Sequence, residues 1–216
     1  MTYSVKEAFY SLQGEGAHTG RPAIFCRFAG CNLWNGREAD RATAICNFCD
    51  TDFVGIDGQN GGKFKTAELL VQHLAALWPS DQAHRYVIFT GGEPLLQLDT
   101  SLINAMHSAS FEVGVETNGT IPAPAGLDWL CVSPKGTAEV VISQCDELKL
   151  VFPQADAPPE RFAHVQASHY YLSPMNPPHA ELIAPQSANV RATIDYCLAH
   201  PQWRLTLQTH KILGVD

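Results

Sequence analysis

The stretch that decides the fold is residues 23–49, which read AIFCRFAGCNLWNGREADRATAICNFC. It opens with the apolar run Ala23–Phe28, and this run predicts a buried β-strand because Ile and Phe dominate it. Three cysteines follow, Cys31, Cys46 and Cys49, in a C-x14-C-x2-C pattern. We therefore expect a cysteine-bearing loop at the carboxyl end of this strand.

Cysteine thiolates at this spacing fit two kinds of metal site. Iron–sulfur clusters take thiolates, and a C-x2-C turn lets two sulfurs converge on one cluster. Three protein thiolates would leave one iron of a four-iron cubane without a protein ligand. This open iron would be the counterpart of the free coordination position in a catalytic zinc site. The alternative is a structural zinc site with Cys26 as its fourth thiolate. Cys26 lies inside the apolar strand, however, where it fits a core position more easily.

Further apolar runs extend this strand into an alternating pattern of strands and helices. We predict strands at Ala23–Phe28, Tyr86–Thr90, Phe111–Glu116, Trp129–Ser133, Leu148–Phe152, Tyr170–Ser173 and Arg204–Gln208. We predict helices at Ala67–Trp78, Thr100–Ser108, Pro159–His164 and Ser187–His200. Such alternation implies βαβ units, a mostly parallel sheet, and ligands bound beyond the carboxyl ends of its strands.

The length of the chain limits how far this pattern can extend. A full eight-fold barrel typically takes ~250 residues, and this chain has 216. We therefore expect a partial parallel β/α barrel of about six strands. No composition shift or low-complexity linker divides the sequence, so we expect a single domain over residues 1–216.

Composition and charge narrow the class of partner. The formal net charge is −8 and Lys plus Arg total 14, which argues against a nucleic-acid partner and favours a small-molecule substrate. The sequence has no run of 18 apolar residues and no secretory signal, so we expect neither a membrane span nor export. We expect a cytoplasmic protein, whose seven cysteines stay reduced or bind metal.

Two motifs resemble the radical S-adenosylmethionine (SAM) superfamily. Cys46-Asn47-Phe48-Cys49 is similar to the end of its cysteine signature, in which an aromatic residue precedes the last cysteine. Thr90-Gly91-Gly92-Glu93-Pro94 follows a predicted strand and resembles its GGEP motif. Two adjacent glycines let the backbone approach a ligand closely, and Glu93 is suited to accept from the methionyl ammonium.

The resemblance narrows to the 7-carboxy-7-deazaguanine synthase family along nearly the whole chain. The similar segments are residues 10–16 (YSLQGEG), 25–34 (FCRFAGCNLW), 49–51 (CDT), 116–119 (ETNG), 133–135 (SPK) and 207–211 (LQTHK). A branch of that family also has fourteen residues between the first two cysteines. The resemblance implies a radical SAM type of partial barrel, with a [4Fe-4S] cluster held by Cys31, Cys46 and Cys49.

The resemblance also implies where SAM binds. The expected contacts are Phe48, Cys49, Asp50, Gly92, Glu93, Glu116, Asn118, Ser133, Pro134, Lys135, Ser173, Pro174, Met175 and Asn176. Most of these residues follow a predicted strand, where a barrel of this kind binds its ligands. Ser173 stands where the family often has Gln, so we expect its backbone to matter more than its side chain.

The substrate that the resemblance implies is 6-carboxy-5,6,7,8-tetrahydropterin. Its ring is contracted to 7-carboxy-7-deazaguanine with release of ammonia, on the route to queuosine and other deazapurines. Arg27 offers a planar fork for the substrate carboxylate, unless a neighbouring Glu takes it into an ion pair. Gln13-Gly14-Glu15 is suited to the aminopyrimidinone edge. The expected substrate contacts are Leu12, Gln13, Gly14, Glu15, Arg27, Thr90, His210 and Asp216.

Further expectations concern magnesium and protein partners. The resemblance implies Mg²⁺ bound by Thr51, for which Asp52 is a competing oxygen ligand. It also implies a homodimer and a flavodoxin-type reductant. Two other functions remain open at this stage: another radical SAM enzyme, such as an activase of glycyl radical enzymes, and a zinc-stabilised binding module.

Overall fold

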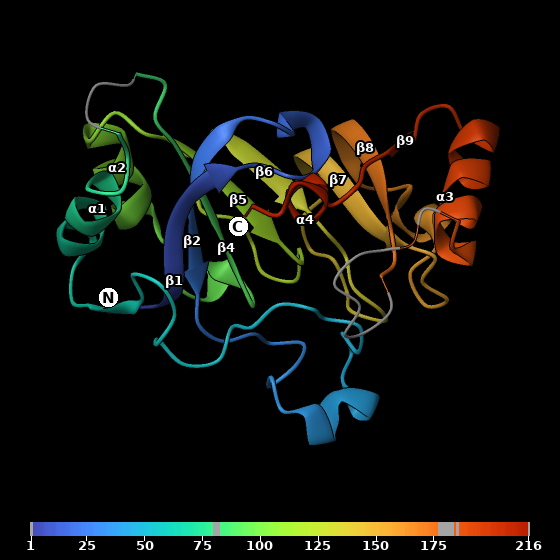
Figure 1. Ribbon diagram of the computed structural model, residues 1–216, viewed down its shortest axis with the longest axis horizontal. Helices are drawn as coiled ribbons and strands as arrows, with labels where there is room; N and C mark the ends of the chain where they lie inside the picture. The colour runs from blue at the N-terminus through green and yellow to red at the C-terminus, as the bar shows by residue number, and fades with distance from the viewer. Residues whose placement is uncertain (1, 80–82, 177–183, 185, 216) are drawn as a thin grey trace.

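Nine strands form one continuous sheet in the computed structural model, which describes residues 2–79, 83–176, 184 and 186–215 (Figure 1). The strands are β1 (Tyr3–Leu12), β2 (Pro22–Phe28), β3 (Gly62–Phe64), β4 (Tyr86–Gly91), β5 (Glu112–Thr117), β6 (Trp129–Val132), β7 (Gln144–Phe152), β8 (Gln166–Pro174) and β9 (Arg204–Leu205). Their spatial order is β3-β1-β2-β4-β5-β6-β7-β8-β9. Strands β2 and β4 to β9 are parallel neighbours, whereas β1 is antiparallel to both β2 and β3.

Helices cover the outer face of this sheet at both ends (Figure 1). The α-helices are α1 (Ala67–Ala75), α2 (Thr100–Ser108), α3 (Ala188–Ala199) and α4 (Thr209–Leu213), and the 3-10 helices are η1 (Gly16–His18), η2 (Glu38–Thr43), η3 (Pro94–Leu96) and η4 (Pro159–Phe162). Thr66, Asp99 and Ser187 cap α1, α2 and α3 by accepting from a backbone N–H. Helices α1 and α2 pack on each other, and α3 packs on β7, β8 and β9.

The two faces of β2 divide the core from the site. Ile24, Cys26 and Phe28 are fully buried in the core beneath the helices. Phe25 and Arg27 alternate with them, face the opposite side of the sheet and line a cavity. The sheet is therefore a wall, with an apolar core outside and polar groups inside.

The observed arrangement is the predicted partial β/α barrel, with more strands than expected. Strands β1 and β3 were missed because polar residues interrupt β1 and its pairing with β2 shifts register between Val5 and Glu7. Strands β7 and β8 begin earlier than predicted, and β9 ends earlier. The helix predicted at Ala67–Trp78 ends at Ala75, the one predicted at Pro159–His164 is the short 3-10 helix η4, and α4 was not predicted.

A loop closes the gap between the two ends of the sheet. No strand pair joins β1 to β8 or β9 among the described residues. Instead, the Gly16 N–H donates to Thr206 Oγ1 at 2.8 Å, and the Thr209 N–H donates to the Gly14 carbonyl at 3.0 Å. The loop after β1 thus reaches the segment after β9. No helix in the described part of the chain is long and apolar enough to cross a membrane.

Candidate active site

A cavity of about 450 Å³ lies at the carboxyl ends of the parallel strands. Its lining includes most of the residues predicted from the sequence: Leu12, Gln13, Gly14, Glu15, Arg27, Cys31, Cys46, Phe48, Cys49, Asp50, Thr51, Thr90, Gly92, Glu116, Asn118, Ser133, Lys135, Ser173, Pro174, Met175, Asn176 and His210. Glu93 and Pro134 are buried outside this lining. Asp216 lies outside the described residues.

The three predicted cluster ligands lie together in the lining of the cavity. Cys31, Cys46 and Cys49 pack in one apolar cluster with Leu33 and Ala138. A hydrogen bond with Cys46 lowers the pKa of Cys49 to about 6. Burial raises the pKa of Cys31, and the Leu33 N–H, which donates to its sulfur at 3.4 Å, partly opposes this rise. Adjacent sulfurs, an apolar surround and a backbone donor fit an iron–sulfur cluster.

Cys26 does not join this group. It is fully buried in the core on the other face of β2, where desolvation raises the pKa of its thiol well above the usual range. Within the described part of the chain, no three His, Cys, Asp or Glu side chains are arranged to hold a single metal ion. A cubane spreads its cysteine ligands over several irons. The geometry therefore gives no support to the zinc site that Cys26 would have completed.

The glycine pair of the GGEP segment places β4 against the cysteine loop. Gly91 has a φ of +139°, and a Cβ on it would overlap the Phe28 carbonyl. A Cβ on Gly92 would overlap the Gly30 carbonyl and the Cys31 Cβ. The close approach that both glycines permit is thus toward protein backbone, and it fixes the start of the cysteine loop.

Glu93 joins two strand ends from behind the cavity wall. Its Oε1 accepts from the Leu95 N–H at 2.9 Å and from Thr117 Oγ1 at 2.7 Å, and its Oε2 accepts from the Asn118 N–H at 2.8 Å. It is fully buried, and desolvation raises the pKa of its carboxyl. Its contact with the methionyl ammonium stays a prediction.

Polar groups follow β5 and β6 into the same cavity. Asn118 donates from Nδ2 to Asn32 Oδ1 at 2.9 Å, which ties β5 to the cysteine loop. Lys135 Nζ donates to the carbonyl and to the Oγ of Ser133, both at 2.5 Å. The end of β8 and the residues after it, Ser173–Asn176, line the cavity with them. These are the residues that the sequence predicts as contacts of SAM.

The loop Gln13–Gly16 forms another side of the cavity. Gly16 has a φ of +70°, a conformation that favours glycine. Gln13 Nε2 donates to Glu116 Oε1 at 2.8 Å, and Gln13 Oε1 accepts from the Glu15 N–H at 3.1 Å. Gln13 therefore braces the loop against β5, while Glu15 presents a carboxylate to the cavity.

Arg27 is paired with a glutamate, as the alternative to substrate binding anticipated. Its Nε donates to Glu7 Oε1 at 2.8 Å, from the residue paired with it across β1 and β2. The pair uses the Nε edge of the guanidinium and Arg27 still lines the cavity. Glu7, on the strand that the sequence did not predict, thereby orients the arginine.

Two lysines hold the acidic residues around Thr51. Lys6 Nζ pairs with Asp52 at 2.9 Å, so the competing magnesium ligand is already engaged. Lys211 Nζ pairs with Asp50 Oδ2 at 2.6 Å. Burial opposes ionisation of Asp50, but the Lys211 ammonium outweighs it and lowers the pKa of this carboxyl. Thr51 itself lines the cavity.

The comparisons with known proteins agree with this geometry. The model of the radical SAM superfamily matches residues 40–145. A protein of Bordetella pertussis named 7-carboxy-7-deazaguanine synthase is 60% identical over 215 residues, and one of the same name from Burkholderia multivorans is 54% identical; each comparison covers 100% of both chains. The chain belongs to the 7-carboxy-7-deazaguanine synthase family. The crystal structure of QueE from Escherichia coli is similar with a TM-score of 0.71 at 27% identity, over 97% of this chain and 95% of that chain.

Membership of the 7-carboxy-7-deazaguanine synthase family makes the chain a radical SAM enzyme of the lyase type. A [4Fe-4S] cluster and SAM are the cofactors of this superfamily, and the cavity offers groups for both. Cys31, Cys46 and Cys49 would hold the cluster, and the polar strand ends beside them would hold SAM. Nothing in the comparisons favours an activase or a zinc module.

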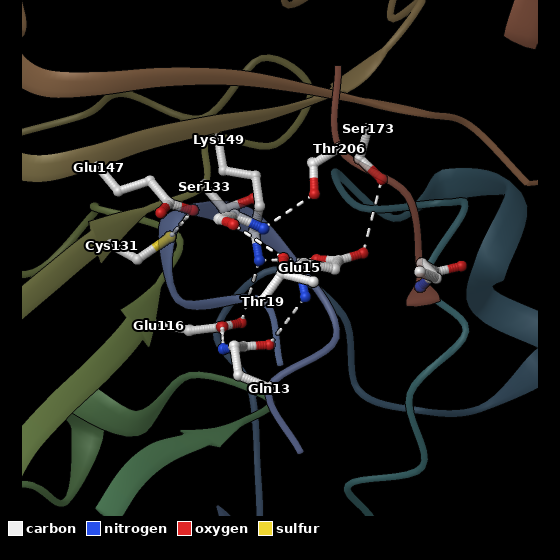
Figure 2. A network of polar contacts seen from close by, with 12 residues as sticks. Gln13, Glu15, Thr19, Glu116, Cys131, Ser133, Glu147, Lys149, Ser173 and Thr206 are labelled. Atoms are coloured by element: carbon white, nitrogen blue, oxygen red, sulfur yellow. Dashed lines mark hydrogen bonds and ion pairs between the residues drawn. The ribbon is translucent and has the colours of Figure 1, made fainter. Parts of the chain in front are cut away.

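Sequence reasoning missed several residues that line the cavity of this family member: Glu7, Phe9, Phe25, Leu33, Trp34, Phe53, Thr117, Lys149, Val151, Gln208 and Lys211. Lys149 is the most informative of them, because it lies at the centre of a polar network (Figure 2). A signal for it exists in the sequence. Glu147 and Lys149 stand two apart in an apolar strand, so they share a face that an ordinary core would not tolerate.

Proposed function

We propose that the chain converts 6-carboxy-5,6,7,8-tetrahydropterin to 7-carboxy-7-deazaguanine with loss of ammonia. One observation carries this proposal: Arg27 and Glu15 line the same cavity as the three cysteines. A cation suited to a carboxylate and an anion suited to ring N–H groups thus share one space with the radical source. The volume of about 450 Å³ is in the range for a small molecule, which disfavours a protein substrate.

The residues of the chain bind and orient the substrate in this proposal. Arg27, steadied by Glu7, holds the carboxylate, and Glu15 accepts from the aminopyrimidinone edge. His210 packs against the loop of Glu15 and lines the cavity. When bound, the cluster and SAM supply the radical chemistry that starts the ring contraction. Orientation and exclusion of water are then the contribution of the protein.

We further propose that Thr51 binds Mg²⁺ together with the substrate and waters. The ion pair between Lys6 and Asp52 supports Thr51 over Asp52 as the ligand, because it occupies the Asp52 carboxylate. Asp50 is held beside it by Lys211 and is placed to orient bound water. A neutral hydroxyl suffices when the other magnesium ligands are oxygen atoms of water and substrate.

The remaining parts of the proposal concern the setting of the enzyme. We propose a single radical SAM domain over residues 1–216, a homodimer, a flavodoxin-type reductant and a cytoplasmic location. The continuous nine-stranded sheet supports one domain within the described residues. The net charge of −8 supports a small-molecule substrate rather than nucleic acid.

The test is anaerobic reconstitution followed by turnover. Iron and sulfide are counted, and the reconstituted protein is given SAM, dithionite and carboxytetrahydropterin. Formation of 7-carboxy-7-deazaguanine with equimolar ammonia supports the proposal. Cleavage of SAM without consumption of the pterin would overturn it, and a pterin that increases SAM turnover without ring contraction would do the same.

A further inference from the structure

Lys149 is a buried cation with two carboxylates on it (Figure 2). Its side chain is 6% exposed, and its Nζ lies 2.6 Å from Glu15 Oε2 and 3.4 Å from Glu116 Oε2. Burial opposes the charge, but Glu116 and Glu15 outweigh it, and the pKa of Lys149 lies well above its usual range. The ammonium is therefore a fixed charge in the wall of the cavity.

The two partners of Lys149 come from different parts of the site. Glu15 belongs to the loop after β1, on the side proposed for the pterin. Glu116 belongs to the carboxyl end of β5, on the side proposed for SAM, and also accepts from Gln13. Burial alone would raise the pKa of Glu116, but Lys149, Gln13 and Lys135 together outweigh it and the pKa is lowered. One ammonium thus contacts a residue proposed for the pterin and a residue proposed for SAM.

Stability does not explain why a lysine occupies this position. A buried ion pair is often replaced by apolar residues at no cost to stability, because desolvation offsets its Coulomb energy. The loop of Glu15 also has its own anchors. The Ala17 N–H donates to Glu147 Oε2 at 2.8 Å, and the Gly16 N–H donates to Thr206. These bonds hold the backbone of the loop without Lys149.

We propose that Lys149 is a positioning residue shared by the pterin and SAM regions, which holds Glu15 and Glu116 in the orientations that bind the two ligands. This inference rests on the proposed function and deepens it. Removal of Lys149 should weaken the binding of both ligands. Removal of the Glu15 charge should weaken mainly the binding of the pterin, and removal of the Glu116 charge mainly the binding of SAM.

The experiment compares Lys149→Met, Glu15→Gln and Glu116→Gln in the reconstituted enzyme. Equilibrium dialysis gives the Kd of SAM and of carboxytetrahydropterin without need for turnover. We expect Lys149→Met to raise both values about tenfold or more. We expect Glu15→Gln to raise mainly the pterin value and Glu116→Gln mainly the SAM value. Adding Lys149→Met to Glu15→Gln should change the pterin Kd by less than about threefold, because Glu15→Gln has already removed the carboxylate through which Lys149 acts on the pterin.

Arg21→Met is the matched control. Arg21 directly precedes β2, pairs with Glu112 of β5 at 2.5 Å in a more exposed position, and does not line the cavity. It should lower the melting temperature without changing either Kd. If Lys149→Met folds poorly, the double variant Lys149→Met/Glu116→Gln replaces it, because it removes one buried charge of each sign. The Kd of the pterin for this double variant should still rise about tenfold.

The outcomes separate the two proposals. A Lys149→Met variant that changes only the melting temperature, or only one of the two Kd values, overturns the role of Lys149. A wild-type chain that binds both ligands but forms no deazaguanine overturns the proposed function, while the two Kd values still decide the role of Lys149. A wild-type chain that binds no pterin overturns both.

Discussion

Gly14 lies so close to His210 that a Cβ at position 14 would overlap the imidazole ring. The contact joins the loop after β1 to helix α4, and the backbone bond from Thr209 to the Gly14 carbonyl runs beside it. Burial lowers the pKa of His210, so this ring favours its neutral form against the glycine. The position of the final helix thus depends on the absence of one methyl group.

Gly14→Ala should displace His210 and open the pterin side of the cavity. Overpacking of this kind costs about 1–3 kcal/mol of stability. Because the displaced His210 lines the cavity, we also expect the KM for the pterin to rise roughly tenfold. The cluster content should not change. Gly20→Ala is the control, because a Cβ there meets nothing within 4 Å. It should cost only the strain of its positive φ, about 1–2 kcal/mol of stability. An unchanged KM in Gly14→Ala would contradict the prediction.

Loss of any one cluster ligand should remove activity. Cys31→Ala, Cys46→Ala and Cys49→Ala should each lose most of the bound iron and sulfide, measured by chemical assay and visible absorbance. Cys26→Ala should keep both, because Cys26 lies in the core, and should cost about 1 kcal/mol of unfolding free energy. Loss of iron from Cys26→Ala would show that the ligand set is wrong.

Arg27→Ala should weaken the binding of the pterin and leave the binding of SAM unchanged. A charged hydrogen bond contributes about 1.5–3 kcal/mol, which corresponds to a roughly 10- to 100-fold rise in KM. Arg27→Lys should not restore binding, since an ammonium lacks the planar fork. Glu7→Gln should give a smaller rise, because Gln still accepts from Nε. Equal losses of SAM and pterin affinity in Arg27→Ala would refute this assignment.

Magnesium dependence should separate Thr51 from Asp52. Thr51→Ala should raise the Mg²⁺ concentration needed for half-maximal activity by about tenfold, the scale of one lost ligand contact. Asp52→Asn removes an ion pair with Lys6 and should change the melting temperature more than the Mg²⁺ requirement. Chelation should lower wild-type activity without removing iron. The reverse pattern in the two variants would make Asp52 the ligand.

Glu147 should make stability depend on pH. Burial raises the pKa of its carboxyl in the folded state, so the native state binds this proton more tightly than the unfolded state does. Its contribution is fully present below the ordinary carboxyl pKa and is lost as the pH rises through the raised value. Glu147→Gln should therefore lose less unfolding free energy than wild type between pH 4 and pH 8, measured by urea titration.

Glu139→Gln is the control for that comparison, because it removes the same charge from an exposed position. Its pH dependence should follow wild type. If Glu147→Gln also follows wild type, then Glu147 does not gain a proton on folding.

The sequence was sufficient to predict the parallel part of the sheet and the grouping of Cys31, Cys46 and Cys49. Apolar runs such as Ala23–Phe28 mark strands of this sheet because one face packs in the core and the other carries further large side chains, such as Phe25, at the cavity. Strand β1 escaped because Lys6 and Glu7 break its apolar pattern where the register shifts. Those two side chains are engaged by Asp52 and Arg27, which are distant in sequence, so only the folded chain explains them.

Most residues predicted for the site line one cavity, but the contacts among them were not predicted. Gly92 lines the cavity as predicted for a SAM contact, but its close approach to Gly30 and Cys31 was not predicted. Glu93 accepts from backbone N–H groups and from Thr117 behind the wall, contacts that the sequence did not predict, and its contact with the ligand stays a prediction. Lys149 was not predicted because its burial makes sense only beside its carboxylate partners, and one of them, Glu15, lies more than a hundred residues away in the sequence. Spacing along the chain carries no record of such a pair.

The loop that closes the sheet has a consequence for how this scaffold can vary. In a fully paired barrel, strand number and stagger together fix the inner circumference. Here the last gap is spanned by hydrogen bonds from Gly16 and Thr209, outside any strand ladder. A change in the length of the loop after β1 would therefore alter the size of the cavity, and with it the size of heterocycle that fits, without changing which strands pair.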